Sequence, residues 1–170
     1  MLNKKLFINI LLLITVSACG WQLRDTQLLS ADIGAIHLTA QDSHSRLIAE
    51  LRQGLDNYGI STTSIRAEAS YTIVILDSRA SRRTSTLNSG ARVAEYQLNE
   101  DVDFTIFDQA GNQLTGLVTA SVEKVFEFDE RDVLASANEE QLVRNQMHQE
   151  IVRQILNHFS RLPIVNAGPR

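Results

Sequence analysis

The sequence predicts an α+β fold, a two-layer sandwich in which two α-helices pack on one face of a mixed four- to five-stranded β-sheet. Three observations predict it. Apolar and polar residues alternate in the middle of the chain, which is typical of half-buried strands. Two other segments carry apolar residues three and four positions apart, which is typical of amphipathic helices. The predicted order along the chain is strand, helix, four strands and helix.

The first 18 residues have the parts of a bacterial export signal. Lys4 and Lys5 form a basic start, and residues 6–16 form an apolar run that is too short to span a bilayer. The only cysteine, Cys19, follows directly in the pattern V-S-A-C, which resembles the lipobox of bacterial lipoproteins. That resemblance implies a signal peptide over residues 1–18 and acyl chains on Cys19. An ordinary cleaved signal with an incidental cysteine, or a membrane-spanning anchor, are the alternatives.

Several acyl chains hold a protein on its membrane, since each buried methylene contributes about 0.8 kcal/mol. Gly20 rather than Asp follows Cys19, which by resemblance to enterobacterial lipoproteins implies sorting to the outer membrane. We therefore predict a lipidated N-terminus and tether over residues 19–33, one folded domain over residues 34–163 and a short tail over residues 164–170. We predict no cofactor apart from the covalent acyl chains, and no disulfide, because the single cysteine is acylated.

The folded domain is predicted to begin with a strand, a helix and a second strand. Residues 35–40 alternate as a strand does, and a weaker strand pattern covers residues 60–65. Asp42 and Ser43 are candidate cap residues for the helix between them, and Tyr58-Gly59 ends it. A unit of this length normally places its two strands parallel, with the helix over one face. The apolar face of this helix contains Leu47, Ile48, Leu51 and Leu55.

Three further strands follow. Residues 71–76 are apolar at nearly every position and predict a central strand that is covered on both faces, or at least buried at its centre. Residues 94–107 alternate, and Glu100 interrupts their apolar row, which indicates a β-bulge. A hairpin loop over residues 108–112 leads into a partner strand over residues 114–128. The apolar row contains Tyr96, Leu98, Val102, Phe104 and Ile106.

A long amphipathic helix is predicted at the end of the domain. Residues 136–139, S-A-N-E, have the spacing of a capping box, and Pro163 ends the helix. The apolar stripe contains Val143, Met147, Ile151, Ile155, Phe159 and Leu162, and it is widened by Leu142, Val152 and Leu156.

No pattern in the sequence indicates catalysis or a metal site. The histidines, at positions 37, 44, 148 and 158, do not have the i and i+4 spacing of helical zinc ligands. Nucleophile-elbow, P-loop and G-x-G-x-x-G motifs are absent. Glu95, Asp101 and Asp103 share one strand face as possible paired carboxylates, but a solvated polar face explains them more simply. We predict that the protein is not an enzyme, and its 20 acidic against 16 basic residues disfavour nucleic-acid binding.

Residues 78–92 are rich in Ser, Thr and Arg and contain no acidic residue. One interpretation is phosphate binding, because arginine holds phosphate in bidentate fashion. The other is that these arginines keep an exposed strand end soluble and block edge pairing. In a regular strand, Arg79 and Arg83 point to one side and Arg82 to the other. The candidate phosphate-binding residues are Arg79, Arg82, Arg83 and Arg92.

Four segments, in their order and distances, resemble the LptE (RlpB) family of lipopolysaccharide-assembly lipoproteins. They are C-G-W-Q-L-R at residues 19–24, A-E-Y-Q-L at residues 94–98, K-V-F at residues 124–126 and the terminal helix. The resemblance implies a two-helix, four-stranded sandwich that plugs the LptD β-barrel as a 1:1 complex at the periplasmic face of the outer membrane. It also implies binding of lipopolysaccharide during its delivery to the outer leaflet.

Two features depart from the family pattern. After K-V-F the run is E-F-D-E-R, without the aromatic residues and N-P pair of the family, and Ser136 and Ala137 replace basic side chains expected near the helix entry. Lipopolysaccharide binding would therefore depend on the four arginines of residues 78–92. The alternative function is a free-standing outer-membrane lipoprotein that binds lipid or peptidoglycan.

Overall fold

The structure is a computed structural model that describes residues 33–41 and 45–162. Several predicted features lie outside the described residues: the signal peptide 1–18, residues 19–32 of the lipidated N-terminus and tether, Pro163 and the tail 164–170. Asp42 and Ser43 also lie outside, and the prediction that they cap the first helix is wrong, because the Ser45 hydroxyl accepts from the Ile48 N–H as the N-cap. The strands are β1 (Ile36–Ala40), β2 (Thr62–Thr63), β3 (Tyr71–Leu87), β4 (Val93–Asp108) and β5 (Val118–Glu127). The helices are α2 (Arg46–Asn57), the 3-10 turn η2 (Arg66–Glu68) and α3 (Val133–Ser160).

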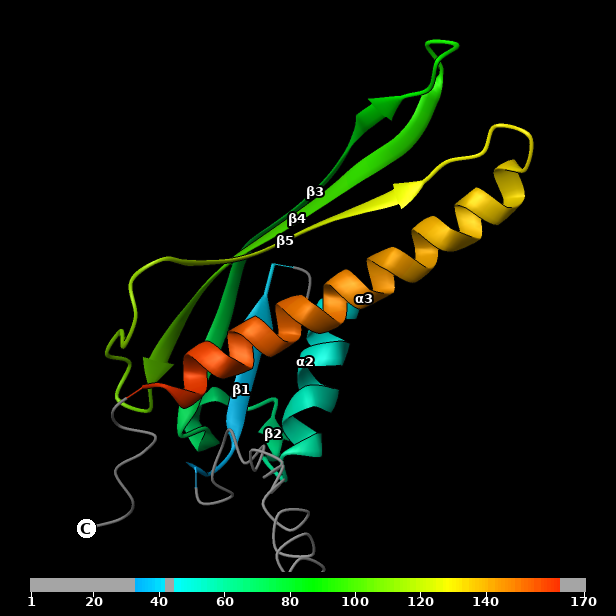
Figure 1. Ribbon diagram of the computed structural model, residues 1–170. Coiled ribbons are helices and arrows are strands. Elements are labelled where there is room, and N and C mark those ends of the chain that lie inside the picture. Colours follow the sequence, from blue (N-terminus) through cyan, green and yellow to red (C-terminus); the bar gives the residue numbers. More distant parts are fainter. Residues whose placement is uncertain (1–32, 42–44, 163–170) are drawn as a thin grey trace, which may run out of the picture.

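The predicted two-layer sandwich is confirmed. The five strands form one mixed sheet in the order β2-β1-β3-β4-β5, and α2 and α3 pack on one face of it (Figure 1). Strand β1 is parallel to both β2 and β3, as expected for strands joined by a helical crossover. Strands β3, β4 and β5 are antiparallel and follow one another in sequence.

The sheet is much longer on the β3–β5 side than on the β1–β2 side. Strand β1 pairs with β3 only over residues 71–75, whereas β3 pairs with β4 as far as Leu87. Beyond Ile75, β3 has β4 as its only partner among the described strands. Figure 1 shows the β3–β4 hairpin and α3 continuing well past β1 and α2. We call this part, residues 76–103 and 119–140, the distal extension.

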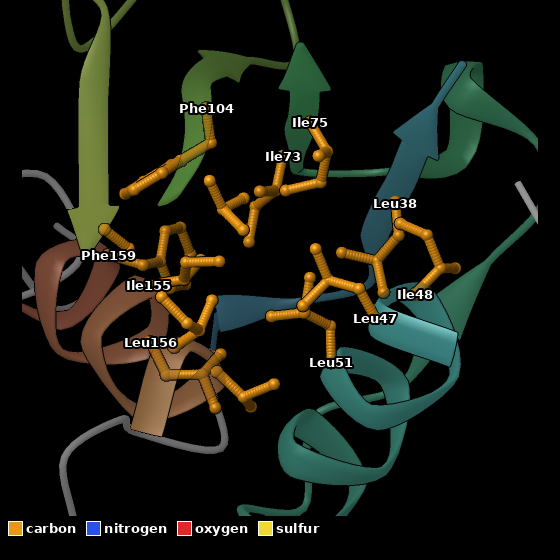
Figure 2. Packing of buried hydrophobic residues seen from close by; sticks show 14 of the residues in the cluster. Leu38, Leu47, Ile48, Leu51, Ile73, Ile75, Phe104, Ile155, Leu156 and Phe159 are labelled. Carbon is orange, nitrogen blue, oxygen red and sulfur yellow. The ribbon is translucent and has the colours of Figure 1, made fainter. Parts of the chain in front are cut away.

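The core lies between the helices and the sheet, and the predicted apolar face of α2 is buried there. From α3, the side chains of Ile155 and Phe159 point toward Ile73 and Phe104 of the sheet (Figure 2), while Leu156 lies against α2 at Gly54. Val143 is only partly buried and Leu142 is exposed, so the stripe of α3 is narrower near its start than predicted. The buried residues of α2 are Leu47, Ile48, Leu51 and Leu55.

Helices α2 and α3 come into close contact at Gly54. A Cβ atom on Gly54 would lie 3.0 Å from Leu156 Cδ1 and 3.0 Å from Val152 Cγ1 of α3. The missing side chain therefore sets the distance between the two helices. The end of α2 is as predicted, with Gly59 in the left-handed region at φ +73°.

The free edge of β5 is covered by a side chain of α3. The amide group of Gln154 donates to the Ser121 carbonyl at 3.0 Å and accepts from the Ser121 N–H at 3.2 Å. This pair of hydrogen bonds imitates a neighbouring strand. The edge of β3 in the distal extension has no such cover among the described residues, and its ladder is irregular near Ile75 and near Thr84–Leu87.

Three further predictions about local structure are wrong, one of them only in part. Strand β3 is buried at Thr72, Ile73 and Ile75, as predicted for its centre, but Leu76 at the end of the predicted strand is 49 % exposed. The ladder runs through Glu100 without a bulge. Helix α3 begins at Val133, before the predicted capping box, because the Asp132 carboxylate accepts from the Ala135 N–H at 3.0 Å.

Two strands are shorter than predicted. The second strand covers only Thr62–Thr63 instead of residues 60–65, and β5 begins at Val118 instead of residue 114. In the described ranges, neither helix combines the length and the apolar character needed to cross a membrane.

Candidate functional site

The two faces of the distal extension have different chemistry. The alternation predicted for β4 is confirmed, because Leu98, Val102 and Phe104 are buried. Tyr96 of the same row is partly buried and packs against the core. The opposite face carries polar side chains, and no described element covers it. We call this opposite face of β3, β4 and β5 in the distal extension the polar face.

Arg79 lies on the polar face between two carboxylates. Its guanidinium donates to Asp77 of its own strand and to Asp103 of β4, the latter at 2.7 Å. The Thr119 hydroxyl of β5 donates to the same Asp103 at 2.6 Å. These hydrogen bonds, from Arg79 first and then from Thr119, lower the pKa of the Asp103 carboxyl. Arg79 thus forms part of a hydrogen-bonded row across three strands.

Arg83 lies further along the same face. Its Nε donates to Gln97 Oε1 at 2.8 Å, and its guanidinium lies 3.6 Å from the Glu123 carboxylate of β5. Between the two arginines, Asp101 accepts from Ser121 of β5 and from Asn99. The polar face is therefore a network of hydrogen bonds in which most side chains already have partners.

The three carboxylates considered for acid–base chemistry share the polar face but are not paired with one another. Asp101 and Asp103 accept from hydroxyl groups of β5, and Glu95 accepts from the Thr86 hydroxyl at 2.9 Å. Each carboxylate therefore has its own hydrogen-bond donor. In the described part of the chain, no three His, Cys, Asp or Glu side chains form a possible metal site.

Arg82 points to the opposite side, toward α3. Its guanidinium lies 4.6 Å from the centroid of the Tyr96 ring and donates to Glu140 of α3 at 2.8 Å. Glu140 also accepts from Arg144 at 2.6 Å. Burial by itself would raise the pKa of Glu140, but donation from Arg144 and Arg82 holds this pKa below its usual value. Arg82 therefore connects the free edge of β3 to the first half of α3.

Replacing Glu140 with glutamine is expected to lower the free energy of unfolding by about 1 kcal/mol at neutral pH, because two guanidinium groups lose a charged acceptor. Since the pKa of Glu140 is lowered in the folded protein, its contribution is present above the ordinary carboxyl pKa and is lost as the pH falls. Urea unfolding of both proteins should therefore differ at about pH 7 and converge below about pH 4. A difference that persists at low pH would contradict this. The neighbouring exposed Glu139→Gln is the control.

A groove of about 810 Å³ lies at the end of the distal extension. We call it the distal groove. The hairpin tip, the end of β5 and the first turns of α3 line it, and Arg92 forms an ion pair with Glu130 there. Donation from Arg131 lowers the pKa of Asp129 in the same groove. Carboxylates outnumber arginines in the lining: Glu95, Glu127, Asp129, Glu130, Asp132 and Glu139 against Arg92 and Arg131.

The structure does not gather the four candidate arginines at one site. Arg79 and Arg83 share the polar face and Arg82 lies on the other side, as the strand period predicts, while Arg92 lies at the distal groove. Each arginine has a carboxylate partner, and most of these partners come from other segments of the chain. The positive field expected from residues 78–92 is therefore offset. The position of Arg79, Arg82 and Arg83 on a free edge agrees with the solubility interpretation as well.

A second polar cluster beneath α3 does not follow from the sequence patterns. Glu100 is buried on the core face of β4, and the imidazole of His148 from α3 lies against it. The signal for it in the sequence is a charged residue within the apolar row, a pattern that equally indicates a bulge.

The architecture is that of several solved bacterial lipoproteins. The chain is similar to rare lipoprotein B from Shewanella oneidensis, with 18% identity and a TM-score of 0.67 over 76% of this chain and 96% of that one. For an uncharacterized lipoprotein B from Nitrosomonas europaea the identity is 21% and the TM-score 0.69, over 83% and 90% of the two chains. For a minor lipoprotein from Acinetobacter baumannii the values are 21% and 0.61, over 75% and 91%. At these identities the likeness shows the fold alone.

The sequence then defines the family. The family model for LptE, described as lipopolysaccharide-assembly, matches residues 33–159. The chain belongs to the LptE family, and the predicted resemblance is confirmed. Membership implies a non-enzymatic outer-membrane lipoprotein of lipopolysaccharide assembly. No curated protein matches the chain.

Proposed function

We propose that this chain is the lipoprotein subunit of the lipopolysaccharide translocon. In this role it plugs the LptD β-barrel in a 1:1 complex, supports the assembly of that barrel and binds lipopolysaccharide during its delivery to the outer leaflet. The observation that carries the proposal is the family match over residues 33–159, which includes nearly all of the described body.

The polar face supports the role of a plug. A surface inside a water-filled barrel must keep its polar groups hydrogen-bonded without relying on a large apolar contact area. The rows from Arg79 to Thr119 and from Asn99 to Ser121 meet this requirement within the chain itself. The length of the β3–β4 hairpin and of α3 gives the elongated shape seen in Figure 1, which suits a lumen.

Purification from detergent-solubilised outer membranes tests the proposal. We expect a large β-barrel protein to be recovered with the chain in equal amount. Recovery of the chain alone would contradict the role of a plug and support the free-standing lipoprotein that binds lipid or peptidoglycan.

Acyl chains on Cys19 hold the proposed subunit at the periplasmic face of the outer membrane, after removal of residues 1–18. Mass spectrometry of the mature chain should show Cys19 as the first residue with acyl chains attached. The variant Cys19→Ser should appear in the soluble periplasmic fraction, because no acyl chain can then be attached. An unmodified amino terminus on the wild-type chain would contradict the anchor.

Arg79, Arg82, Arg83 and Arg92 are the proposed contacts to lipopolysaccharide phosphates. An arginine that already donates to a carboxylate can donate to a phosphate with the same planar geometry. Charge reversal at Arg79, Arg82 and Arg83 should weaken lipopolysaccharide binding by about tenfold or more, since a charged hydrogen bond contributes about 1.5–3 kcal/mol. Association with the barrel should remain intact.

Charge reversal at Arg82 could weaken binding in two ways, by removing a contact to phosphate or by releasing β3 from α3. Arg82 also connects β3 to α3, so a separate Arg82→Gln variant should be measured beside an Arg79→Gln, Arg83→Gln pair on the polar face. The matched control is Arg153→Glu, an exposed arginine of α3 outside the distal extension. Binding that is equal in all these proteins and the wild type would remove the arginine assignment while leaving the plug proposal in place.

A further inference from the structure

Three titratable side chains from three elements meet beneath α3. They are Glu50 of α2, Glu100 of β4 and His148 of α3, which we call the carboxylate–histidine cluster. His148 Nε2 lies 3.2 Å from Glu100 Oε1, and His148 Nδ1 lies 3.6 Å from Glu50 Oε2. Only 6 % of the Glu100 side chain is exposed, against 21 % for Glu50 and 24 % for His148. The imidazole therefore lies between two carboxylates, one of them inside the core.

The two atoms that face each other on the α2 side lack a hydrogen bond. Glu50 Oε2 and His148 Nδ1 are both buried, and at 3.6 Å from each other neither has a hydrogen-bond partner among the described residues. An imidazole donates from both ring nitrogens only in its doubly protonated form. That form provides a donor for Glu100 and a donor for Glu50 at the same time. With one ring proton fewer, either Glu100 loses its donor or Glu50 keeps only the donor from Arg46, which is costly in a partly dry site.

The arginines around the cluster donate to carboxylates. Arg46 of α2 donates to Glu50 at 2.6 Å. Arg144 of α3 donates to Glu140, which also accepts from Arg82 of β3. The residues that flank Glu100 in the sheet are uncharged: Ala80 of β3 and Val122 of β5.

The charge of the cluster therefore depends on one proton that Glu100 and His148 share. Burial raises the pKa of the Glu100 carboxyl, and the charge of His148, followed by that of Arg144, opposes this increase. A raised carboxyl pKa in the folded state means that the contribution of Glu100 to stability is largest at low pH and is lost as the pH rises.

We propose that the carboxylate–histidine cluster is a proton-dependent latch, which holds α3 against α2 and β4 while the cluster retains this proton and loosens α3 when the proton leaves. His148 lies in the middle of α3. The first turns of the same helix line the distal groove through Ala135, Ser136 and Glu139. The latch thus controls how firmly the helix that borders the groove is held, and it does not depend on the proposed function.

Hydrogen exchange of the purified full chain in detergent tests the latch. After correction for the intrinsic pH dependence of exchange, protection of wild-type amides in residues 143–152 should fall by at least about tenfold between about pH 6 and about pH 9. In Glu100→Gln, where no buried carboxylate remains on β4, the fall should be less than about threefold. The control Glu68→Gln removes an exposed carboxylate and should behave as the wild type. Equal pH dependence in Glu100→Gln and the wild type overturns the proposal.

A second measurement needs no variant of Glu100. Nitrogen-15 NMR of the histidine side chains, with His148 assigned by His148→Gln, reports whether one or both ring nitrogens carry a proton. We expect both to be protonated over the pH range in which residues 143–152 are protected, and one proton to be lost in the range where protection falls. A neutral ring throughout the protected range overturns the latch even if Glu100→Gln does not fold.

Discussion

Replacing Phe159 with alanine is expected to lower the free energy of unfolding by about 3–5 kcal/mol. The side chain is 0 % exposed, and its ring meets the edge of Tyr71 with centroids 5.3 Å apart. Figure 2 shows it beside Ile155 and Phe104, between the last turns of α3 and the sheet. Truncation removes the apolar contact and leaves a cavity that these neighbours cannot fill without moving.

Chemical denaturation, monitored by circular dichroism, measures this decrease in the free energy of unfolding. The matched control is Leu134→Ala in the same helix, where the side chain is 74 % exposed and the expected change is within about 0.5 kcal/mol. If Phe159→Ala were as stable as Leu134→Ala, the last turns of α3 would not be part of the core, and the packing shown in Figure 2 would be contradicted.

Replacing Gly54 with leucine is expected to cost about 2–3 kcal/mol, because the new side chain must enter the contact between α2 and α3. Its Cβ alone would lie 3.0 Å from atoms of Val152 and Leu156. The variant Gly54→Ala should cost much less, since the two neighbouring side-chain ends need to shift only slightly and alanine favours the helix.

Thermal and urea unfolding of both variants give the comparison. Gly116→Leu is the control, because a Cβ at that position would meet no atom within 4 Å. If Gly54→Leu were no more costly than Gly116→Leu, the two helices would not be in close contact at this point.

The sequence predicted those parts of the fold that depend on the period of apolar residues along one element. The alternation from Leu98 to Ile106 and the stripe from Met147 to Phe159 both appear as buried faces, because one buried side is enough to produce the pattern. The parallel pairing of β1 and β2 was also predictable, since the crossover between them contains one short helix.

Features that depend on distant segments were not predictable. The apolar character of Leu76 predicts a buried position, but burial at this position would require cover on the second face of the sheet. A charged residue within an apolar row indicates a bulge when the strand is considered alone, whereas the contact of Glu100 with His148 involves another element.

The ion pairs of the arginines also depend on distant segments of the chain. The sides to which Arg79, Arg82 and Arg83 point follow from the strand period, and the structure agrees. Their ion pairs do not follow from it, because Glu140 lies 58 positions from Arg82 and Asp103 lies 24 positions from Arg79. A local stretch without acidic residues therefore does not ensure a positive surface in the folded protein.

The succession of β3, β4 and β5 has a consequence for folding kinetics. Each of these strands pairs with its neighbour in the sequence, so the meander can form by closing two short loops. Strand β1 must instead find β3 across a segment that includes α2, which is a slower search. We therefore expect the hairpins to form early, with the parallel half of the sheet and its helix added afterwards.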